Sequence, residues 1–136
     1  MSSYTMAVTL DQPYDETVAR VREALKTQGF GVLTEIDVRA TLKAKLDVDV
    51  PAQVILGACR PELAHRALSA TPSLGALLPC NVVVRTGPDG RTVVEAIDPD
   101  AMARLEELPV IQEVAADARA RLAAALEALT PVDVEA

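Results

Sequence analysis

The stretch that decides the fold is residues 55–65, ILGACRPELAH, together with residues 77–84, LLPCNVVV, and residues 96–99, AIDP. These runs contain both cysteines and the only histidine of the chain. The apolar run that ends at Ala58 is suited to a buried strand, and Pro61 favours the start of a helix because its missing N–H would be unpaired there anyway. The runs specify local backbone structure, and none of them is a recognised catalytic signature.

Working outward toward the N-terminus, apolar residues alternate with polar or small ones in residues 4–10, which predicts a half-buried strand. Apolar residues then recur at helical spacing up to Gln28, with Asp11 as the predicted cap and Gly29 as the left-handed stop. A second strand is predicted from Phe30 to Ile36.

The segment from Asp37 to Val50 fits two patterns. Val38, Leu42 and Leu46 lie four residues apart, which favours a short helix. Alternation after Leu46 favours extended chain leading to Pro51. We therefore expect a helix over 37–46 followed by strand-like chain, then the strand from Gln53 to Ala58.

The second half of the chain carries clearer signals. Residues 81–85 and 92–97 are predicted strands, and the turn sequence Gly-Pro-Asp-Gly at residues 87–90 predicts a hairpin between them. Asp98-Pro99 should begin a helical turn that places Met102 and Leu105 on one side.

The last helix should begin at Pro109 and end before Pro131. Its predicted buried stripe is Val110, Val114, Ala115, Ala118, Leu122, Ala125, Leu126 and Leu129. The order of elements predicts an α+β fold, with a largely antiparallel sheet of about five strands and helices packed on one face. We expect one domain over residues 1–130 and a frayed tail over residues 131–136.

Composition excludes several classes of function. The chain has 136 residues, of which 50% are hydrophobic, so it can bury a proper core. Its only aromatic residues are Tyr4, Tyr14 and Phe30, and its net charge is −7. Nucleic-acid binding needs basic surface and stacking aromatics, so we expect no nucleic-acid partner.

Membrane insertion and export are also not expected. Residues 67–84 carry no formal charge, but prolines, a glycine and an asparagine interrupt them, so loop plus buried strand is the better interpretation. The N-terminus lacks the pattern of a secretory signal. Two cysteines in such a chain are most simply reduced thiols, which predicts a cytoplasmic protein.

Three runs carry a resemblance to a known family. They are GACRPELAHRAL at residues 57–68, PSLGALLPCNVVVR at residues 72–85 and IDPDAM at residues 97–102. With the terminal helix, they resemble domain-of-unknown-function family 302, with the fold called TT1751-like. The resemblance implies a small β-α-β-β-α-β-β-α domain that tends to form dimers, and it implies no reaction, substrate or catalytic residue.

The two cysteines are candidate thiol or ligand residues. Cys59 lies just before the helix that begins at Pro61, and a helix N-terminus favours a thiolate, whereas Glu62 and burial oppose one. Cys80 and its neighbour Asn81 begin a predicted central strand. A helical crossover normally joins parallel strands, which would separate the cysteines by about six residues at roughly 3.3 Å each. Antiparallel strands would bring them together to bond or to share a metal.

Three further residues complete the candidate set. Glu62 and His65 are spaced to lie on one helix face, which is a weak metal signal on its own. With both cysteines they would form a Cys₂-His-Glu zinc set, although typical Cys-x-x-Cys spacing is missing. Asp98 is best interpreted as a cap, with a catalytic carboxylate as the alternative.

Two functions from different classes remain. The first is a non-enzymatic homodimeric binding or assembly module with a small apolar ligand or a protein partner. The second is a thiol-dependent redox or metal-binding protein that uses Cys59, with Cys80 and His65 as further residues. We favour the first. No nucleotide-binding glycine loop occurs, so we expect no cofactor. No serine lies in a nucleophile elbow, which argues against a classical hydrolase.

Overall fold

The computed structural model describes residues 2–130, which contain one antiparallel sheet. Its strands are β1 (Thr5–Leu10), β2 (Gly31–Asp37), β3 (Gln53–Cys59), β4 (Cys80–Thr86) and β5 (Thr92–Ile97). Their order is β1-β5-β4-β3-β2, and every neighbouring pair is antiparallel. The α+β fold with helices on one side of this sheet is therefore confirmed. The predicted tail, residues 131–136, lies outside the described residues.

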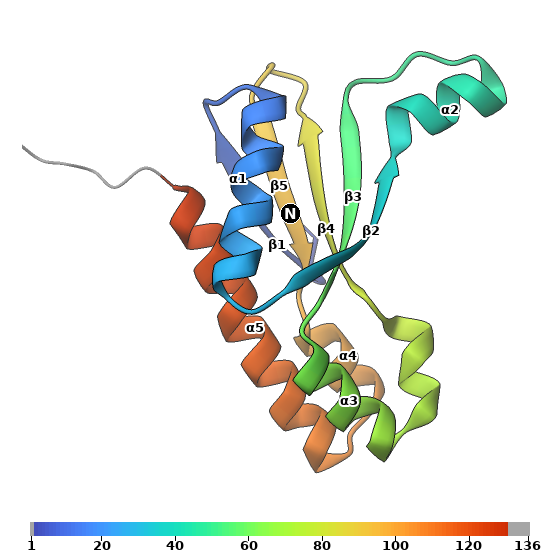
Figure 1. Cartoon of the computed structure of the whole chain (residues 1–136), viewed down its shortest axis with the longest axis vertical. Helices are drawn as coiled ribbons and strands as arrows, with labels where there is room; N and C mark the ends of the chain where they lie inside the picture. The colour runs from blue at the N-terminus through green and yellow to red at the C-terminus, as the bar shows by residue number, and fades with distance from the viewer. Residues whose placement is uncertain (1, 131–136) are drawn as a thin grey trace, which may run out of the picture.

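The helices form two groups. They are α1 (Tyr14–Thr27), α2 (Val38–Leu46), α3 (Pro61–Ala70), the 3₁₀ turn η1 (Pro72–Leu77), α4 (Asp100–Leu105) and α5 (Pro109–Leu129). Helices α1 and α5 cover one face of the sheet, as Figure 1 shows. Below the sheet, α3, η1 and α4 surround the first half of α5 and form what we call the helical lobe.

Four residues have the backbone conformation or helix position that the sequence predicts for helix ends and turns. Gly29 adopts a φ of 83° directly after α1, and Gly90 adopts 81° in the β4–β5 hairpin. Both angles are in the left-handed region that glycine tolerates best. Pro61 and Pro109 occupy the first positions of α3 and α5.

Three local predictions were wrong. Asp11 is 83% exposed and does not cap α1, because the N-cap position is Pro13, two residues later, and the helix has no side-chain cap. The helix ending at Leu46 is confirmed, but the strand-like chain beyond it is not a strand. Asp47 takes a left-handed φ of 53° there and turns the chain.

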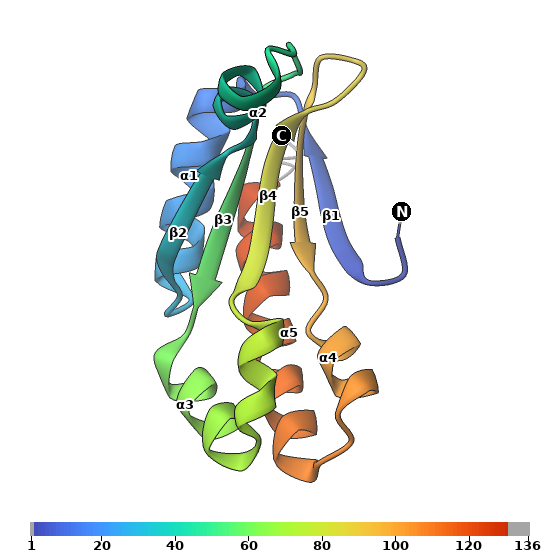
Figure 2. The same ribbon diagram turned by 90° about the vertical axis from the view of Figure 1, so that its right-hand side faces the viewer.

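The third wrong prediction concerns α4. Met102 is 5% exposed, as expected for a core residue, but Leu105 is 72% exposed. Helix α4 has only six residues and lies at the edge of the helical lobe (Figure 2), so Met102 reaches the core and Leu105, at the end of the helix, faces outward.

Two apolar clusters form the core, and α5 contributes to both. The larger cluster fills the space between the sheet, α1 and the second half of α5, where Leu122 and Leu126 are buried. The smaller one lies in the helical lobe and includes Ile111 and Val114 from the first half of α5. The predicted stripe of α5 is buried except for Val110, which is half-buried, and Ile111 joins it.

A close approach at Gly57 of β3 generates a first prediction. A Cβ at this position would lie 2.8 Å from Pro79 Cγ and would also overlap the hydroxyl of Thr34 on β2. Replacing Gly57 with alanine should therefore lower the free energy of unfolding by about 1–3 kcal/mol, measured by urea denaturation. Gly75→Ala is the control, because its Cβ would meet Leu68 at an ordinary 3.6 Å. Equal stability of the two variants would contradict the crowding.

Candidate functional site

The second face of the sheet is not covered by the helices of residues 2–130. Figure 2 looks onto this side, with α2 above the strands and η1 below them. We call it the open face. Its side chains alternate with the buried ones along each strand and belong to Thr5, Ala7, Thr9, Thr34, Ile36, Gln53, Ile55, Asn81, Val83, Arg85, Val93, Glu95 and Ile97.

One row of cross-strand neighbours crosses the whole open face. Ala7, Glu95, Val83, Ile55 and Ile36 are successive partners from β1 to β2. Apolar side chains predominate in this row, and most of them are only half-buried. Contiguous exposed apolar surface is typical of interaction sites, which makes this row a candidate.

Glu95 is the polar centre of the open face. Its side chain is only 16% exposed. Thr5 Oγ1 donates a hydrogen bond to Glu95 Oε2, and Arg85 Nη1 donates to Oε1 at 2.8 Å. The Thr5 hydrogen bond, followed by the bond and charge of Arg85, holds the pKa of this carboxyl below its usual value against the opposing effect of burial.

A groove lies beside Glu95 at the lower end of the open face. Its volume is about 370 Å³. The walls combine apolar and polar side chains, among them Tyr4, Leu77, Asn81, Val83 and Ile97. Asn81 thus lies on the open face, on the side of β4 opposite to Cys80.

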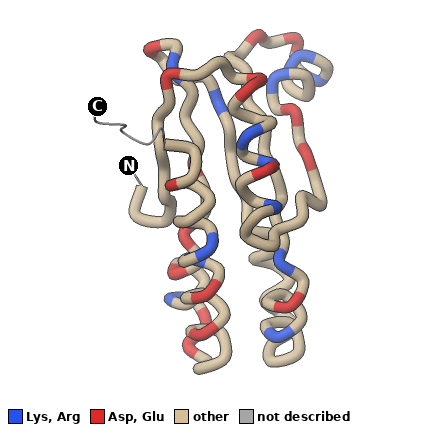
Figure 3. Tube along the Cα trace, turned by 60° about the vertical axis from the view of Figure 1, so that its left-hand side comes forward, with Lys and Arg blue, Asp and Glu red and all other residues tan. Residues whose placement is uncertain are grey.

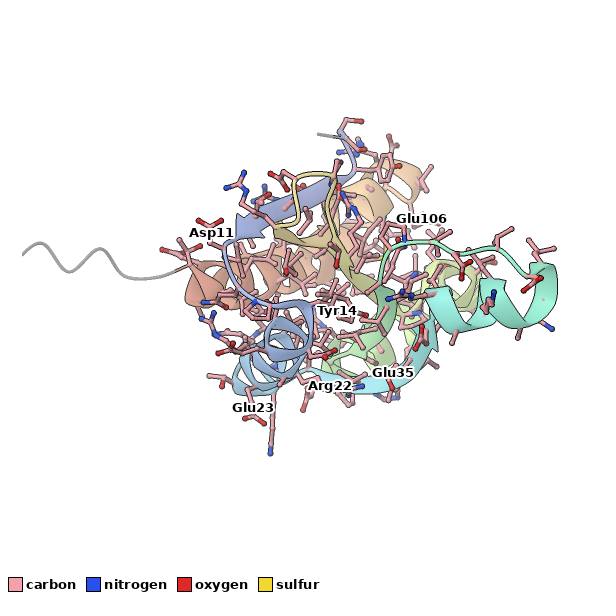
Figure 4. The ribbon with its side chains drawn as sticks, turned by 90° about the horizontal axis from the view of Figure 1, so that it is seen from above. Asp11, Tyr14, Arg22, Glu23, Glu35 and Glu106 are labelled. Carbon is pink, nitrogen blue, oxygen red and sulfur yellow. The ribbon has the colours of Figure 1, made fainter. Side chains whose placement is uncertain are left out.

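Strand β2 lies at the edge of the sheet, helix α2 projects from it, and neither element is well covered by other parts of residues 2–130. Every side chain of β2 except Val32 is exposed, and α2 has no buried residue. Leu33 is 65% exposed, Ile36 48% and Leu46 66%. We call residues 31–50 the β2–α2 arm. Figure 4 shows that its helix extends away from the body of the molecule, while Arg22 of α1 pairs with Glu35 at the edge of the sheet.

The two cysteines lie closer together than a helical crossover predicts. β3 and β4 are antiparallel neighbours despite the helix between them, and Ala58 pairs with Cys80. The parallel alternative was wrong because α3 and η1 turn the chain back beyond the end of the sheet. Cys59 is therefore one residue from the partner of Cys80. Both cysteines are free of disulfide bonds, and both residues line a pocket of about 30 Å³.

Burial raises the pKa of both thiols. For Cys59 the second cause is the negative charge of Glu62. For Cys80 burial, followed by the proximity of Cys59, raises the pKa to about 11. Neither cysteine is thus poised as a thiolate at neutral pH.

The predicted Glu62–His65 pair lies on the surface of α3. Both side chains are exposed, and Glu62 contacts Arg60 at 3.7 Å. Across residues 2–130, no three His, Cys, Asp or Glu side chains come close enough to hold a metal ion. The Cys₂-His-Glu zinc set is therefore not assembled in the part of the chain that the structure describes.

Asp98 caps the turn after β5 and also binds a distant arginine. The Asp100 N–H donates to Asp98 Oδ1 at 3.0 Å, as a cap requires. Arg119 Nε of α5 donates to the same carboxylate at 3.1 Å and 3.2 Å. This pair ties α4 to α5, which supports a structural role for Asp98.

Sequence reasoning missed Glu95, Arg85 and Arg119. A signal existed for the first two, because each is a charged residue inside an otherwise apolar alternating strand. They are diagonal neighbours, since Glu95 pairs with Val83 and Arg85 with Val93, and this arrangement depends on the register of β4 and β5, which local pattern does not reveal. Arg119 lies 21 residues from its partner and carried no comparable signal.

The chain is similar to known proteins in both sequence and structure. The sequence model of a protein family, the domain of unknown function DUF302, matches residues 6–129 of the chain. The chain belongs to the DUF302 family. Its structure is similar to the crystal structure of an uncharacterised conserved DUF302 protein from Bacillus stearothermophilus, with a TM-score of 0.86. The two chains are 33% identical, and the match covers 95% of this chain and 100% of that one. Among curated proteins, none matches the chain.

Membership of DUF302 confirms the predicted family and assigns no activity. The helices described in this DUF302 chain include none that is long and apolar enough to cross a membrane. Two candidate functional regions stand out among residues 2–130. One is the open face with its β2–α2 arm, and the other is the pocket lined by the two cysteines, which we call the thiol pocket.

The environment of Glu95 predicts a pH-dependent stability. A carboxyl whose folded-state pKa is lowered stabilises the fold above its ordinary value of 4.5, and this contribution disappears as the pH falls through the lowered pKa. Glu95→Gln should thus cost about 1–3 kcal/mol at pH 7 and progressively less below pH 4.5, measured by urea unfolding. Glu107→Gln, at an exposed position, is the control. A deficit that persists unchanged in acid would argue against the proposed role.

The raised pKa of Cys59 predicts slow reaction with thiol reagents. In a Cys80→Ala background, Cys59 should be labelled slowly at pH 7 in the native state and quickly after unfolding. The native rate should increase as the pH rises toward the raised pKa. Equal rates for native and unfolded protein at pH 7 would show that the thiolate is already available.

Proposed function

We propose that this protein is a homodimeric binding or assembly module whose open face and β2–α2 arm receive a second copy of the chain. The observation that carries the proposal is an arm with exposed leucine and isoleucine side chains beside a sheet face that no helix of residues 2–130 covers.

Helix α2 supports the proposal through its apolar stripe. A surface helix of a globular protein normally buries the apolar side of its pattern against a neighbour. Val38, Leu42 and Leu46 lie on one side of α2, yet none of them is buried. A short helix gains most of its stability from such packing, so a partner that covers this side would stabilise the arm.

Charge favours a second copy on the open face. The chain carries a net charge of −7, so most identical surfaces would repel one another. Figure 3 shows acidic and basic residues along the outer helices. On the open face the charged residues are Arg85 and Glu95, which form a salt bridge and leave the patch close to neutral. Two such patches can meet without net repulsion.

Two-fold symmetry fits this surface. A two-fold dimer brings the same patch of both subunits together, so the patch must complement itself. The open face presents an apolar row across the sheet. It also presents one hydrogen-bond acceptor, the carboxylate of Glu95, and one donor, the guanidinium of Arg85, on neighbouring strands. A stable dimer needs roughly 1,200 Å² of total buried surface, and the arm extends the available area beyond the sheet.

Light scattering coupled to size-exclusion chromatography tests the proposal. The wild-type protein should have twice the 14.4 kDa mass of one chain at micromolar concentration. Leu46→Asp on α2 and Ile36→Asp on β2 should each shift the mass toward that of one chain, because they place charge in the apolar contact. Circular dichroism checks that the variants remain folded.

The chain offers a matched control. Leu105 of α4 is 72% exposed, close to the 66% of Leu46, but it lies outside the open face and the arm. Leu105→Asp should remain a dimer. A wild-type mass of one chain would refute dimerisation, and dissociation by Leu105→Asp alone would place the interface on the helical lobe instead.

A further inference from the structure

The two edges of the sheet differ in chemistry, although no strand of residues 2–130 lies beyond either of them. At one edge, β2 carries Glu35 and Asp37 and has an irregular register between Val32 and Thr34. Charges and bulges of this kind are devices by which natural proteins keep edge strands from pairing. At the other edge (Figure 2), β1 has the uncharged sequence TMAVTL and a regular register with β5. The β1 edge is therefore suited to receive a further strand.

The backbone of β1 directs a row of hydrogen-bonding groups to this edge. In an antiparallel ladder, alternate residues of a strand bond to opposite neighbours. The Asp98 N–H donates to the Tyr4 carbonyl at 2.8 Å, and in the same register every second residue after Tyr4 bonds to β5. The N–H and C=O groups of the residues between them, Thr5, Ala7 and Thr9, therefore point away from β5.

We propose that the β1 edge pairs antiparallel with β1 of a second copy of this chain, about a two-fold axis at Ala7. The two five-stranded sheets then become one continuous sheet. In this register Thr5 lies opposite Thr9 of the partner subunit, and Ala7 lies opposite Ala7 of the partner subunit. These are the residues whose backbone groups point to the edge, so each pair exchanges two hydrogen bonds.

The sequence of β1 is complementary to itself in this register. Residues 5–9 read Thr-Met-Ala-Val-Thr, so the same chemical types recur in reverse order. Cross-strand threonine pairs stabilise a sheet. Met6 and Val8 pack against the core but stay half-buried, and each would cover the other's counterpart in the partner subunit. A two-fold contact requires such self-complementarity, whereas a strand from an unrelated protein does not, and this favours a second copy as the occupant.

Charge also permits a second copy at this edge. The chain has a net charge of −7, so most contacts between identical surfaces bring acidic residues together. Residues 4–10 carry no charge. Asp11 is the first acidic residue beyond β1, and in the proposed register it lies opposite Ser3 of the partner subunit. Like charges therefore do not face each other across the paired strands.

The pairing uses the backbone edge of β1 and does not rest on the proposed contact between open faces. A two-fold axis normal to the sheet leaves both open faces on the same side, so the two contacts can coexist. A pair of six-residue strands buries far less than the roughly 1,200 Å² of a stable interface, so it should form only at about 0.1–1 mM protein.

Sedimentation equilibrium between about 10 µM and about 1 mM protein tests the pairing. The wild-type mass should double over this range. Thr9→Pro removes an N–H that points to the edge and no bond to β5, and an edge strand tolerates proline at such a position. It should weaken the association at least about tenfold. Thr9→Val, which keeps the N–H and the β-branched shape, is the matched control and should associate like the wild type. A constant wild-type mass, or equal association of the two variants, would overturn the proposal.

Hydrogen exchange in the wild-type protein locates the contact without any variant. The amides of Thr5, Ala7 and Thr9 should exchange at least about tenfold more slowly at 1 mM than at 10 µM protein, because pairing protects them. The amides of the residues between them already bond to β5 and should change little. Slowing on β2 instead, or unchanged exchange of these β1 amides, would contradict the proposed edge.

Leu46→Asp separates this proposal from the open-face dimer. Its mass should still double between the two concentrations, because Leu46 lies on the β2–α2 arm, away from β1. If the open-face dimer does not form, the wild-type mass should start from one chain of 14.4 kDa and still double. If the edge does not pair, the mass of both proteins should stay at its starting value, and the proposal is refuted.

Discussion

The rest of the structure depends on the packing of α5, because this one helix supplies the apolar wall of two cores. Its second half covers the sheet together with α1, and its first half holds α3 and η1 in the helical lobe. Each fully buried leucine or isoleucine in this stripe contributes about 1.5–3 kcal/mol. Arg20 of α1 and Asp98 after β5 add hydrogen bonds to α5 from both sides. Without this helix, the lobe would lose the apolar surface it packs against, and α1 alone would remain over the buried face of the sheet.

The same arrangement determines where function can lie. Two long helices suffice for one face of a five-stranded sheet, so the other face and the β2–α2 arm retain half-buried and exposed apolar side chains. The second region is the pocket at the junction between the sheet and the lobe. β3 ends there and β4 begins there, so the cysteine residues of both strands line it. The open face and the pocket are thus separate consequences of the same packing.

The candidate residues illustrate how far local pattern reaches. Asp98 was predicted as a cap because an aspartate before Pro99 satisfies the next amide groups, and it does so. Its bond to Arg119 could not be predicted, because the docking angle of α5 decides it. Cys59 and Cys80 were recognised as a pair whose spacing depends on topology. Their antiparallel relation required the complete path through α3 and η1.

The sequence by itself determined the elements of this protein and their class. Alternation in β1, β4 and β5, prolines at the first positions of α3 and α5, and glycines at Gly29 and Gly90 are local signals, and each acts through backbone conformation within a few residues. Only the tertiary structure decided the strand order, the salt bridge between Glu95 and Arg85 and the antiparallel register that makes the strands of Cys59 and Cys80 neighbours. These features join residues that are far apart in the chain, and their positions follow from how the layers pack, which no local pattern encodes.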